Sequence, residues 1–254
     1  MNAVTLPALQ VAGLVKRYGA RRVLEGVGLD IAPGSAVGLV GANGAGKTTF
    51  LKCVLDLCAC DAGSVRIFGV PSARAESRAR LAYVPERFVP PYYLLGREFL
   101  AMTAALGGAR YDPQRARALV EALELDPQAL EHPVRQLSKG MAQKLGLAGC
   151  FLLEKDLYVL DEPMSGLDPA ARVAVKSHLA RLHREGRALL FTSHVLADVE
   201  ELCQQIAVLD EGAVRFCGAP AELCARYGEA NLERAFLSCL RTEAAHAGQA
   251  AIRA

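Results

Sequence analysis

The 254-residue chain has neither a long apolar run nor an excess of charge of one sign. Hydrophobic residues make up 52% of it, yet no segment approaches the ~20 consecutive apolar residues that span a bilayer. Its 29 basic and 27 acidic residues give a formal net charge of +2, which argues against nucleic acid as a main partner. The first ten residues also lack the basic stretch and apolar core of a secretory signal. These absences predict a cytoplasmic chain that forms no membrane pore of its own.

The sequence contains no internal repeat at a fixed period and no low-complexity tract. Its length suits one large α/β domain, or a core with an inserted lobe. Strands are expected at residues 9–15, 23–31, 36–40, 65–68, 157–160, 188–192, 206–210 and 213–217. Helices are expected at 48–57, 97–106, 113–123, 139–153, 170–184 and 195–203. The alternation predicts a sheet with a parallel section, and the helical stretch from 97 to 153 predicts an inserted lobe.

A phosphate-binding pattern stands at residues 41–48, where GANGAGKT matches G-x-x-x-x-G-K-[ST] after an apolar run. Glycines let backbone N–H groups curl around phosphate oxygens, and the helix that starts here points its positive end at the same charge. Lys47 can reach the β- and γ-phosphates, and the hydroxyl of Thr48 can ligate Mg²⁺. The residues expected to hold the nucleotide here are Gly41, Asn43, Gly44, Ala45, Gly46, Lys47, Thr48 and Thr49. The loop alone does not separate kinases, GTPases and ATPases.

Two acidic residues, Asp161 and Glu162, follow the apolar run 157–160. A buried charge is costly unless it meets a metal or a partner, and ligands bind beyond the carboxyl ends of strands in open α/β sheets. Asp161 therefore suits the Mg²⁺ shell, and Glu162 is placed to polarise an attacking water. Beside a phosphate loop, the pair indicates a catalytic site rather than a solvated loop.

Ser138 and Gly140 open the helical pattern 139–153, and Ser138 could be an ordinary helix N-cap. Along the chain come the phosphate loop, this S-x-G element, the Asp-Glu pair, the letters SGLD at 165–168, and His194 after the run 188–192. That order resembles the nucleotide-binding subunits of ATP-binding cassette (ABC) transporters over almost the whole chain. The resemblance implies an α/β fold, with a P-loop NTPase core, an N-terminal antiparallel β part and an inserted helical lobe.

The resemblance also implies roles for single residues. Ser138 and Gly140 match the signature that binds the γ-phosphate held by the opposite subunit. Asp168 matches the loop that couples the two sites, and His194 matches the switch histidine at the γ-phosphate. Tyr18, in KRYG at 16–19, matches the aromatic residue that stacks on adenine, although the residues alone favour an ordinary edge-strand tyrosine.

Two positions depart from the common pattern of the family. The signature commonly reads LSGGQ, whereas residues 137–141 read LSKGM. The loop residue that touches Mg²⁺ or the attacking water is usually Gln, whereas YVPE at 83–86 offers Glu86. Both departures resemble the branch that serves drug, lipid, polysaccharide and cofactor exporters, and Glu86 is expected near the metal.

The resemblance implies a subunit that binds ATP and Mg²⁺ and hydrolyses ATP at the cytoplasmic face of the inner membrane. Its implied partners are an integral-membrane transporter subunit and a second copy of the chain in a head-to-tail dimer, with no nucleic acid. Two alternatives stay open: a cassette that transmits ATP-driven force to a membrane regulator, and a small-molecule kinase. The expected division of the single domain 1–254 is a nucleotide-binding core at 1–86 and 154–218, a helical lobe at 87–153 and a short helical tail at 219–254.

Aromatic residues are scarce, with 8 Phe, 7 Tyr and no Trp, yet Phe88, Tyr92, Tyr93 and Phe99 fall close together. Prolines at 90 and 91 stiffen the segment. Phe99 is expected inside the lobe, while Tyr92 and Tyr93 are expected outside, where aromatic rings suit the anchoring of another protein. By resemblance, a short cytoplasmic helix of the membrane subunit docks here.

Of eight cysteines, Cys53, Cys58 and Cys60 form a cluster. In a large cytosolic chain such thiols are usually reduced and act as small apolar side chains. A soft-metal ligand set is the alternative, but the sequence supplies no C-x-x-C or His-rich partner to support it.

Overall fold

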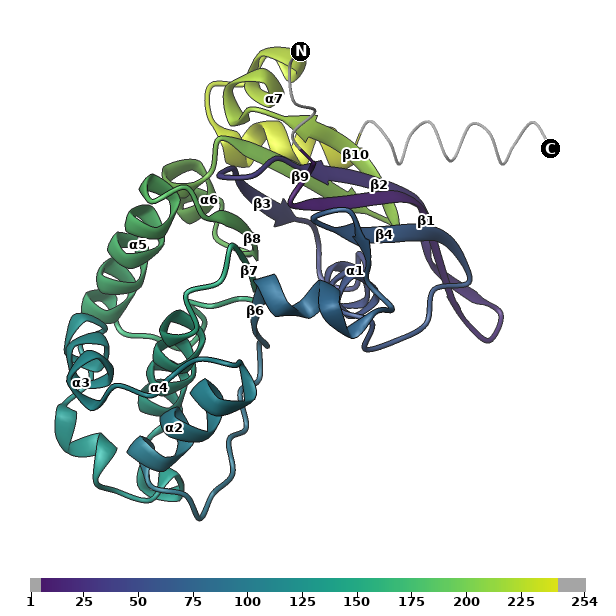
Figure 1. The fold of residues 1–254 in the computed structure, drawn as a ribbon. Coiled ribbons are helices and arrows are strands. Elements are labelled where there is room, and N and C mark those ends of the chain that lie inside the picture. Colours follow the sequence, from purple (N-terminus) through teal and green to yellow (C-terminus); the bar gives the residue numbers. More distant parts are fainter. Residues whose placement is uncertain (1–5, 242–254) are drawn as a thin grey trace, which may run out of the picture.

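Two β-sheets with helices packed on and between them make up the structure, a computed structural model that describes residues 6–241 (Figure 1). The smaller sheet, in the order β2-β1-β4-β5, is antiparallel. The larger sheet, in the order β10-β9-β3-β8-β7-β6, is parallel except for the β9–β10 pair. The strands are β1 (Leu9–Tyr18), β2 (Arg21–Ile31), β3 (Ala36–Val40), β4 (Ala62–Ile67), β5 (Val70–Pro71), β6 (Leu81–Val84), β7 (Leu157–Leu160), β8 (Ala188–Thr192), β9 (Gln205–Asp210) and β10 (Ala213–Gly218). The α-helices are α1 (Lys47–Val54), α2 (Gly96–Leu106), α3 (Pro113–Ala122), α4 (Lys139–Leu152), α5 (Pro169–Arg184), α6 (Leu196–Leu202) and α7 (Pro220–Tyr227).

Helix α1 packs between the two sheets with one face buried. Its Phe50 and Leu51 are fully buried in an apolar cluster that includes side chains of β1, β2, β3 and β9. Along β3, Val37 faces this cluster, whereas Val40 belongs to the cluster on the opposite face of the large sheet. Successive side chains of a strand point to opposite faces, so β3 is apolar throughout because both of its faces are covered. The segment between β3 and α1 is therefore held at both ends by buried elements.

Helices α2, α3 and α4 form a lobe at the lower left of Figure 1, away from the small sheet. Helix α4 begins where the hydroxyl of Ser138 accepts a hydrogen bond from the Met141 backbone N–H at 3.2 Å. Every residue from 143 to 152 is buried, because α4 packs against α2, α3 and the strand β6. This helix joins the lobe to the large sheet, and its first turn carries the S-x-G element.

The structure agrees with the predictions made for Phe99, Tyr92 and Tyr93 among the four clustered aromatic residues. The rings of Phe88 and Phe99 pack edge to face inside the lobe, with 5.3 Å between their centroids. Tyr92 and Tyr93 are 61% and 78% exposed, which confirms the expected division. The carbonyl of Tyr92 accepts a hydrogen bond from the Arg135 N–H at 3.2 Å, so backbone contacts hold the loop in place.

Most predicted elements agree with the structure, and two differences have a physical cause. Helix α1 ends at Val54 instead of reaching residue 57, because Asp56 adopts a left-handed conformation (φ 57°) that turns the chain back. The sequence does not predict β6, a four-residue edge strand that pairs only with β7. Such a short apolar run becomes a strand through long-range pairing, which no local pattern reveals.

The tail predicted at 219–254 is described only in part. It contains α7 and a second helix over residues 232–241, while residues 242–254 lie outside the described residues. Residues 1–5 of the segment considered as a secretory signal also lie outside them. Across the described part of the chain, 6–241, no helix has the length and apolarity needed to cross a membrane.

Stability is expected to depend on pH through the buried His178 of α5. Its ring stacks on Phe151 of α4 at 4.2 Å between centroids, and burial, assisted by the Arg181 guanidinium, lowers its pKa from 6.5 to about 4. Between these values the unfolded chain binds a proton that the native chain does not bind. The free energy of unfolding therefore contains the full contribution of His178 above pH 6.5, and this contribution falls by up to about 3 kcal/mol as the pH drops to 4.

The variant His178→Phe should lose this part of the pH dependence. Urea unfolding at pH 7 and at pH 4.5 measures it, with the exposed His132→Gln as the matched control that keeps the wild-type slope. An equal loss of stability in wild type and His178→Phe would show that His178 is protonated in the folded protein.

Candidate nucleotide-binding site

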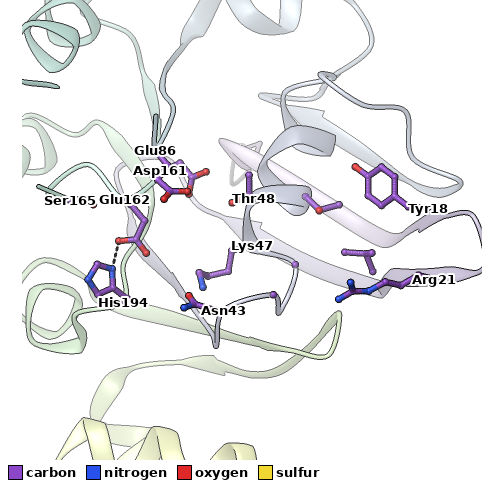
Figure 2. A pocket seen from close by; sticks show the side chains of 14 residues that line it. Tyr18, Arg21, Asn43, Lys47, Thr48, Glu86, Asp161, Glu162, Ser165 and His194 are labelled. Carbon is purple, nitrogen blue, oxygen red and sulfur yellow. Dashed lines mark hydrogen bonds and ion pairs between the residues drawn. The ribbon is translucent and has the colours of Figure 1, made fainter. Parts of the chain in front are cut away.

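A pocket of about 540 Å³ opens at the carboxyl ends of the parallel strands β3, β6, β7 and β8 (Figure 2). Its lining residues are Tyr18, Arg21, Val23, Asn43, Gly44, Gly46, Lys47, Thr48, Thr49, Glu86, Asp161, Glu162, Ser165 and His194. In Figure 2 the acidic side chains lie on one side of Lys47, and Tyr18 and Arg21 lie on the other. Parallel strands end at the same edge of a sheet, which is why residues so distant in the sequence meet here.

The glycine-rich loop between β3 and α1 depends on the small size of its glycines. A Cβ atom on Gly41 would lie 2.2 Å from the Leu209 carbonyl oxygen. Gly46 has φ 110°, a conformation that residues with a Cβ rarely adopt, and it directly precedes α1. The free N–H groups at the start of α1 are therefore directed toward the pocket, where the helix dipole favours an anion.

Lys47, the first residue of α1, carries the positive charge of the pocket floor. Its Nζ donates hydrogen bonds to the carbonyl oxygens of Gly41 at 2.7 Å and Ala42 at 3.2 Å. Burial lowers the pKa of the ammonium, and the nearby carboxylates of Glu162 and Asp161 act in the opposite direction. A partly buried cation held by carbonyls and close to a helix start suits the binding of phosphate oxygens.

Asp161 and Glu162 are fixed by a hydroxyl on the neighbouring strand. The Thr192 hydroxyl of β8 donates to Asp161 Oδ1 at 2.7 Å and accepts from the Glu162 backbone N–H at 2.8 Å. Asp161 is 2% exposed, and burial raises its pKa, with repulsion from Glu86 acting in the same direction. Glu162 has φ 48°, so the backbone bends sharply where the carboxylate enters the pocket.

His194 and Glu162 form a pair above the phosphate loop. The His194 Nδ1 and Glu162 Oε2 atoms are 2.8 Å apart (Figure 2). The histidine side chain is 63% exposed, whereas the Glu162 side chain is only 14% exposed. The carboxylate is thus oriented by an imidazole that still faces the open pocket.

The small sheet supplies the far wall of the pocket through Tyr18, Arg21 and Val23. Tyr18 ends β1 and is half exposed, and the Nζ of Lys16 lies 5.2 Å from the centre of its ring. Arg21 and Val23 begin β2 across the turn. The sequence does not predict Arg21 and Val23, because only the β1–β2 pairing brings them to the loop between β3 and α1.

Three predicted nucleotide contacts, Ser138, Gly140 and Asp168, do not line this pocket. Gly140 instead lies against Gly166, whose carbonyl oxygen would be 3.4 Å from a Cβ at position 140. The exposed Asp168 accepts a hydrogen bond from the Ala171 N–H at 2.9 Å and begins α5, and this bond is the main cause of its lowered pKa. The S-x-G element and residues 166–168, which precede α5, thus form a second surface that does not line the pocket.

Within the phosphate loop, Gly41 and Ala45 do not line the pocket either, since both pack against the protein. Ser165 does line it, although the sequence prediction places only its neighbour Asp168 in the site. Its position follows from the turn after Glu162, whose carbonyl oxygen accepts a hydrogen bond from the Ser165 N–H at 3.0 Å. The sequence signal that could have identified Ser165 is a polar residue three positions after the strand-end carboxylate Glu162.

The pocket lies where a strand is followed by a glycine-rich loop and a helix, and carboxylates at the ends of other strands face it. This arrangement defines the class of P-loop nucleoside triphosphatases. The family described as ABC transporter matches residues 24–165, more than half of the chain. Nod factor export ATP-binding protein I of Paraburkholderia xenovorans (strain LB400) is 36% identical over 225 residues, which cover 86% of this chain and 73% of the relative.

Solved structures agree with this assignment. A structure of an ATP-binding subunit of an ABC transporter superposes with a TM-score of 0.82 at 31% identity, covering 91% of this chain and 99% of that chain. A dimeric ATP-binding cassette protein in a post-hydrolysis state with ADP and phosphate shares the fold, with a TM-score of 0.76 at 21% identity over 83% of this chain and 98% of that chain. The chain belongs to the ABC transporter family and is an ATP-binding, ATP-hydrolysing subunit. The small-molecule kinase considered from the sequence is thereby excluded.

Proposed function

We propose that the chain hydrolyses ATP with Mg²⁺ in the pocket at the loop after β3 and powers export through an integral-membrane partner. It does so as a peripheral subunit at the cytoplasmic face of the membrane. The main evidence for ATP hydrolysis is that Lys47, Glu162 and His194 line the same pocket. The name of the Paraburkholderia relative includes export, which supports the same direction of transport for this chain. We do not extend the cargo in that name to this chain.

Nucleotide binding follows from the two sides of the pocket. The phosphate chain lies along the loop, with Gly44, Gly46 and the N–H groups of Thr48 and Thr49 as donors and Lys47 as the charge partner. The adenine stacks on Tyr18, whose half-exposed ring faces the pocket from β1. Ground-state binding rests on these residues, since they contact parts of the nucleotide that do not change in the reaction.

The residues present fit a magnesium ion. Asp161, Glu86 and the hydroxyl of Thr48 are hard oxygen donors that line the same pocket. Burial raises the pKa of Asp161, repulsion from Glu86 acts in the same direction, and a divalent cation relieves such repulsion. Within residues 6–241 no three His, Cys, Asp or Glu side chains form a ligand cage, as expected for Mg²⁺ held by few carboxylates, waters and phosphates. When bound, Mg²⁺ neutralises charge on the β- and γ-phosphate oxygens.

The variant Glu86→Gln is expected to raise the Mg²⁺ concentration for half-maximal ATPase activity by about two- to tenfold, because the metal loses the attraction of one carboxylate ligand. The amide keeps an oxygen ligand but removes one of three negative charges near the phosphates. A Mg²⁺ titration of the ATPase rate at saturating ATP measures the effect, with Glu200→Gln, on the exposed side of α6, as the matched control. An unchanged titration would argue that Glu86 faces away from the metal.

Hydrolysis is assigned to Glu162 and His194. Glu162 accepts the proton of the attacking water, and the bend at this residue together with the 2.8 Å contact to His194 orients its carboxylate. His194, which remains largely exposed in the pocket, contacts the γ-phosphate through its other ring nitrogen. Developing charge on the transferred group is stabilised by Lys47 and the loop N–H groups.

We further propose that Ser138, Gly140 and Asp168 act across a head-to-tail dimer. These residues lie on one surface outside the pocket, where Gly140 packs on Gly166 and Lys144 lies 3.4 Å from Asp168. The exposed start of α4 offers free N–H groups and Ser138 to the γ-phosphate in a partner's pocket. The cassette protein of the same fold is dimeric, which supports the pairing of two copies.

The exposed Tyr92 and Tyr93 are proposed to dock the membrane partner. The double variant Tyr92→Ser, Tyr93→Ser should weaken co-purification with that partner at least about tenfold, since aromatic anchors contribute much of an interface's binding energy. ATP binding and the melting temperature should stay unchanged, because backbone hydrogen bonds to 134 and 135 hold the loop. Leu106→Ser, 81% exposed in the same lobe, is the control. Wild-type partner affinity in the double variant would place docking elsewhere.

A further inference from the structure

Two thiols meet at the end of α1, on the far side of the helix from its phosphate loop. The Sγ atoms of Cys53 and Cys58 are 3.4 Å apart, with Cys53 buried and Cys58 half buried. This approach is built by the backbone: the N–H groups of Leu57 and Cys58 both donate to the Lys52 carbonyl, at 2.8 and 3.3 Å. The turn at Asp56 folds residue 58 back over the last turn of the helix, so the backbone itself brings the two cysteines together.

The same turn is tied to the strand that carries Tyr18. The Tyr18 hydroxyl donates to Cys58 Sγ at 3.9 Å, and Lys16 Nζ donates to the Ala59 carbonyl at 2.7 Å. The Asp61 N–H donates to the Val15 carbonyl at 2.8 Å. Residues 58–61 and 15–18 are therefore joined by several contacts, and Cys58 is the residue of this turn that contacts the Tyr18 hydroxyl.

A metal site is a poor explanation of this cluster. Cys60 is exposed, and the described residues 6–241 contain no set of three or more Cys, His, Asp or Glu side chains placed to hold an ion. Two sulfur atoms in contact without a third ligand suit a bond between them.

We propose that Cys53 and Cys58 are a reversible oxidation site, whose disulfide displaces Tyr18 and weakens ATP binding. The effect on ATP rests on the adenine contact proposed for Tyr18, whereas formation of the disulfide does not. A disulfide requires an S–S distance of about 2.05 Å, so the two sulfur atoms must approach by about 1.4 Å. Cys58 lies in the turn and Cys53 in a buried helix, so Cys58 makes most of this movement, away from the Tyr18 hydroxyl.

The chemistry balances with hydrogen peroxide as the oxidant. Cys58, the more accessible of the two, gives up its proton to solvent and its sulfur attacks one peroxide oxygen. An S–O bond forms, the O–O bond breaks, and the departing hydroxide takes a proton from solvent and leaves as water. The Cys53 sulfur then attacks the sulfenic sulfur of Cys58, the S–S bond forms, and the S–O bond breaks with loss of a second water that takes the Cys53 proton. In total, two thiols and one peroxide give one disulfide and two waters, with two electrons passing from sulfur to oxygen.

The test oxidises the purified full chain with hydrogen peroxide, blocks the remaining thiols and maps the link by mass spectrometry. Cleavage before Asp56 separates Cys53 from Cys58, and the variant Cys60→Ser shows which of Cys58 and Cys60 is linked. We expect a Cys53–Cys58 link that dithiothreitol reverses, retained in Cys60→Ser and in the exposed-cysteine control Cys217→Ser. It should be lost in Cys58→Ser, a conservative change at a half-buried position.

Titration with a fluorescent ATP analogue completes the test. Oxidation should weaken binding about three- to tenfold in wild type and not in Cys58→Ser, since part of the stacking of a base on an aromatic ring is lost. Absence of the Cys53–Cys58 link, or a link from either residue to Cys60, overturns the site. A link without a change in ATP affinity overturns the effect on binding. In that case the variant Tyr18→Ala separates the two causes. If Tyr18→Ala binds ATP with unchanged affinity, the proposed contact between Tyr18 and adenine is wrong. If Tyr18→Ala binds ATP more weakly, the contact is right and the disulfide does not move Tyr18.

Discussion

ATP turnover is expected to fall on the order of a hundredfold or more when Glu162 is replaced by Gln, while ATP binding stays intact. The amide has the same shape and tolerates the same backbone bend, but it cannot accept the proton of the attacking water. Lys47 and the loop N–H groups still hold the phosphates, so the ATP-bound dimer should form and persist. Phosphate release at saturating ATP measures the rate, and size exclusion with ATP measures the dimer.

The matched control for this variant is Glu200→Gln, which removes an exposed carboxylate from α6 at the surface. Its turnover should equal that of the wild type. Near-normal turnover in Glu162→Gln, with equal protein stability, would remove Glu162 from the proposed mechanism and leave the role of base to another group in the pocket.

The variant Lys47→Ala should instead weaken ATP binding by about ten- to a hundredfold, because a charge-assisted hydrogen bond contributes about 1.5–3 kcal/mol. The contact to phosphate exists in both the ground state and the transition state, so affinity falls together with activity. Lys52→Ala, at an exposed position of the same helix, is the control and should bind ATP normally. Unchanged affinity in Lys47→Ala would show that the ammonium keeps its contacts to Gly41 and Ala42 when ATP binds.

Mixing Lys47→Ala chains with Ser138→Arg chains tests the shared site. Each variant alone should be inactive, since every site in its homodimer lacks either the lysine or the serine. In a mixed dimer one of the two sites combines an intact loop from one chain with an intact S-x-G element from the other. With random exchange and independent sites, about a quarter of wild-type activity should return. If no activity returns although mixed dimers form, or if each variant is active alone, the head-to-tail arrangement is wrong.

The catalytic elements of this protein could be predicted from its sequence where the chemistry needs neighbouring residues. The phosphate loop requires Gly46 and Lys47 between a preceding strand and a following helix. The residues that indicate the strand, the loop and the helix are contiguous in the sequence. Asp161 and Glu162 follow an apolar run for the same reason, because a parallel strand ends at the ligand edge of the sheet. The alternation of these elements predicted a sheet with a parallel section, and the family resemblance implied the full fold class. Both are confirmed, whereas the division of the domain at 86, 153 and 218 stays a prediction.

Tertiary structure decided what depends on residues far apart in the chain. The contact between His194 and Glu162, 32 positions apart, exists because β7 and β8 are neighbours in the sheet. Arg21 enters the pocket because β2 pairs with β1, and β6 is a strand only because β7 lies beside it. The separation of Ser138 from the pocket was likewise not readable from its spacing to Asp161, because the lobe carries it to another surface. Local propensity determines short segments, while strand pairing and burial, which act over the whole chain, determine which of them meet.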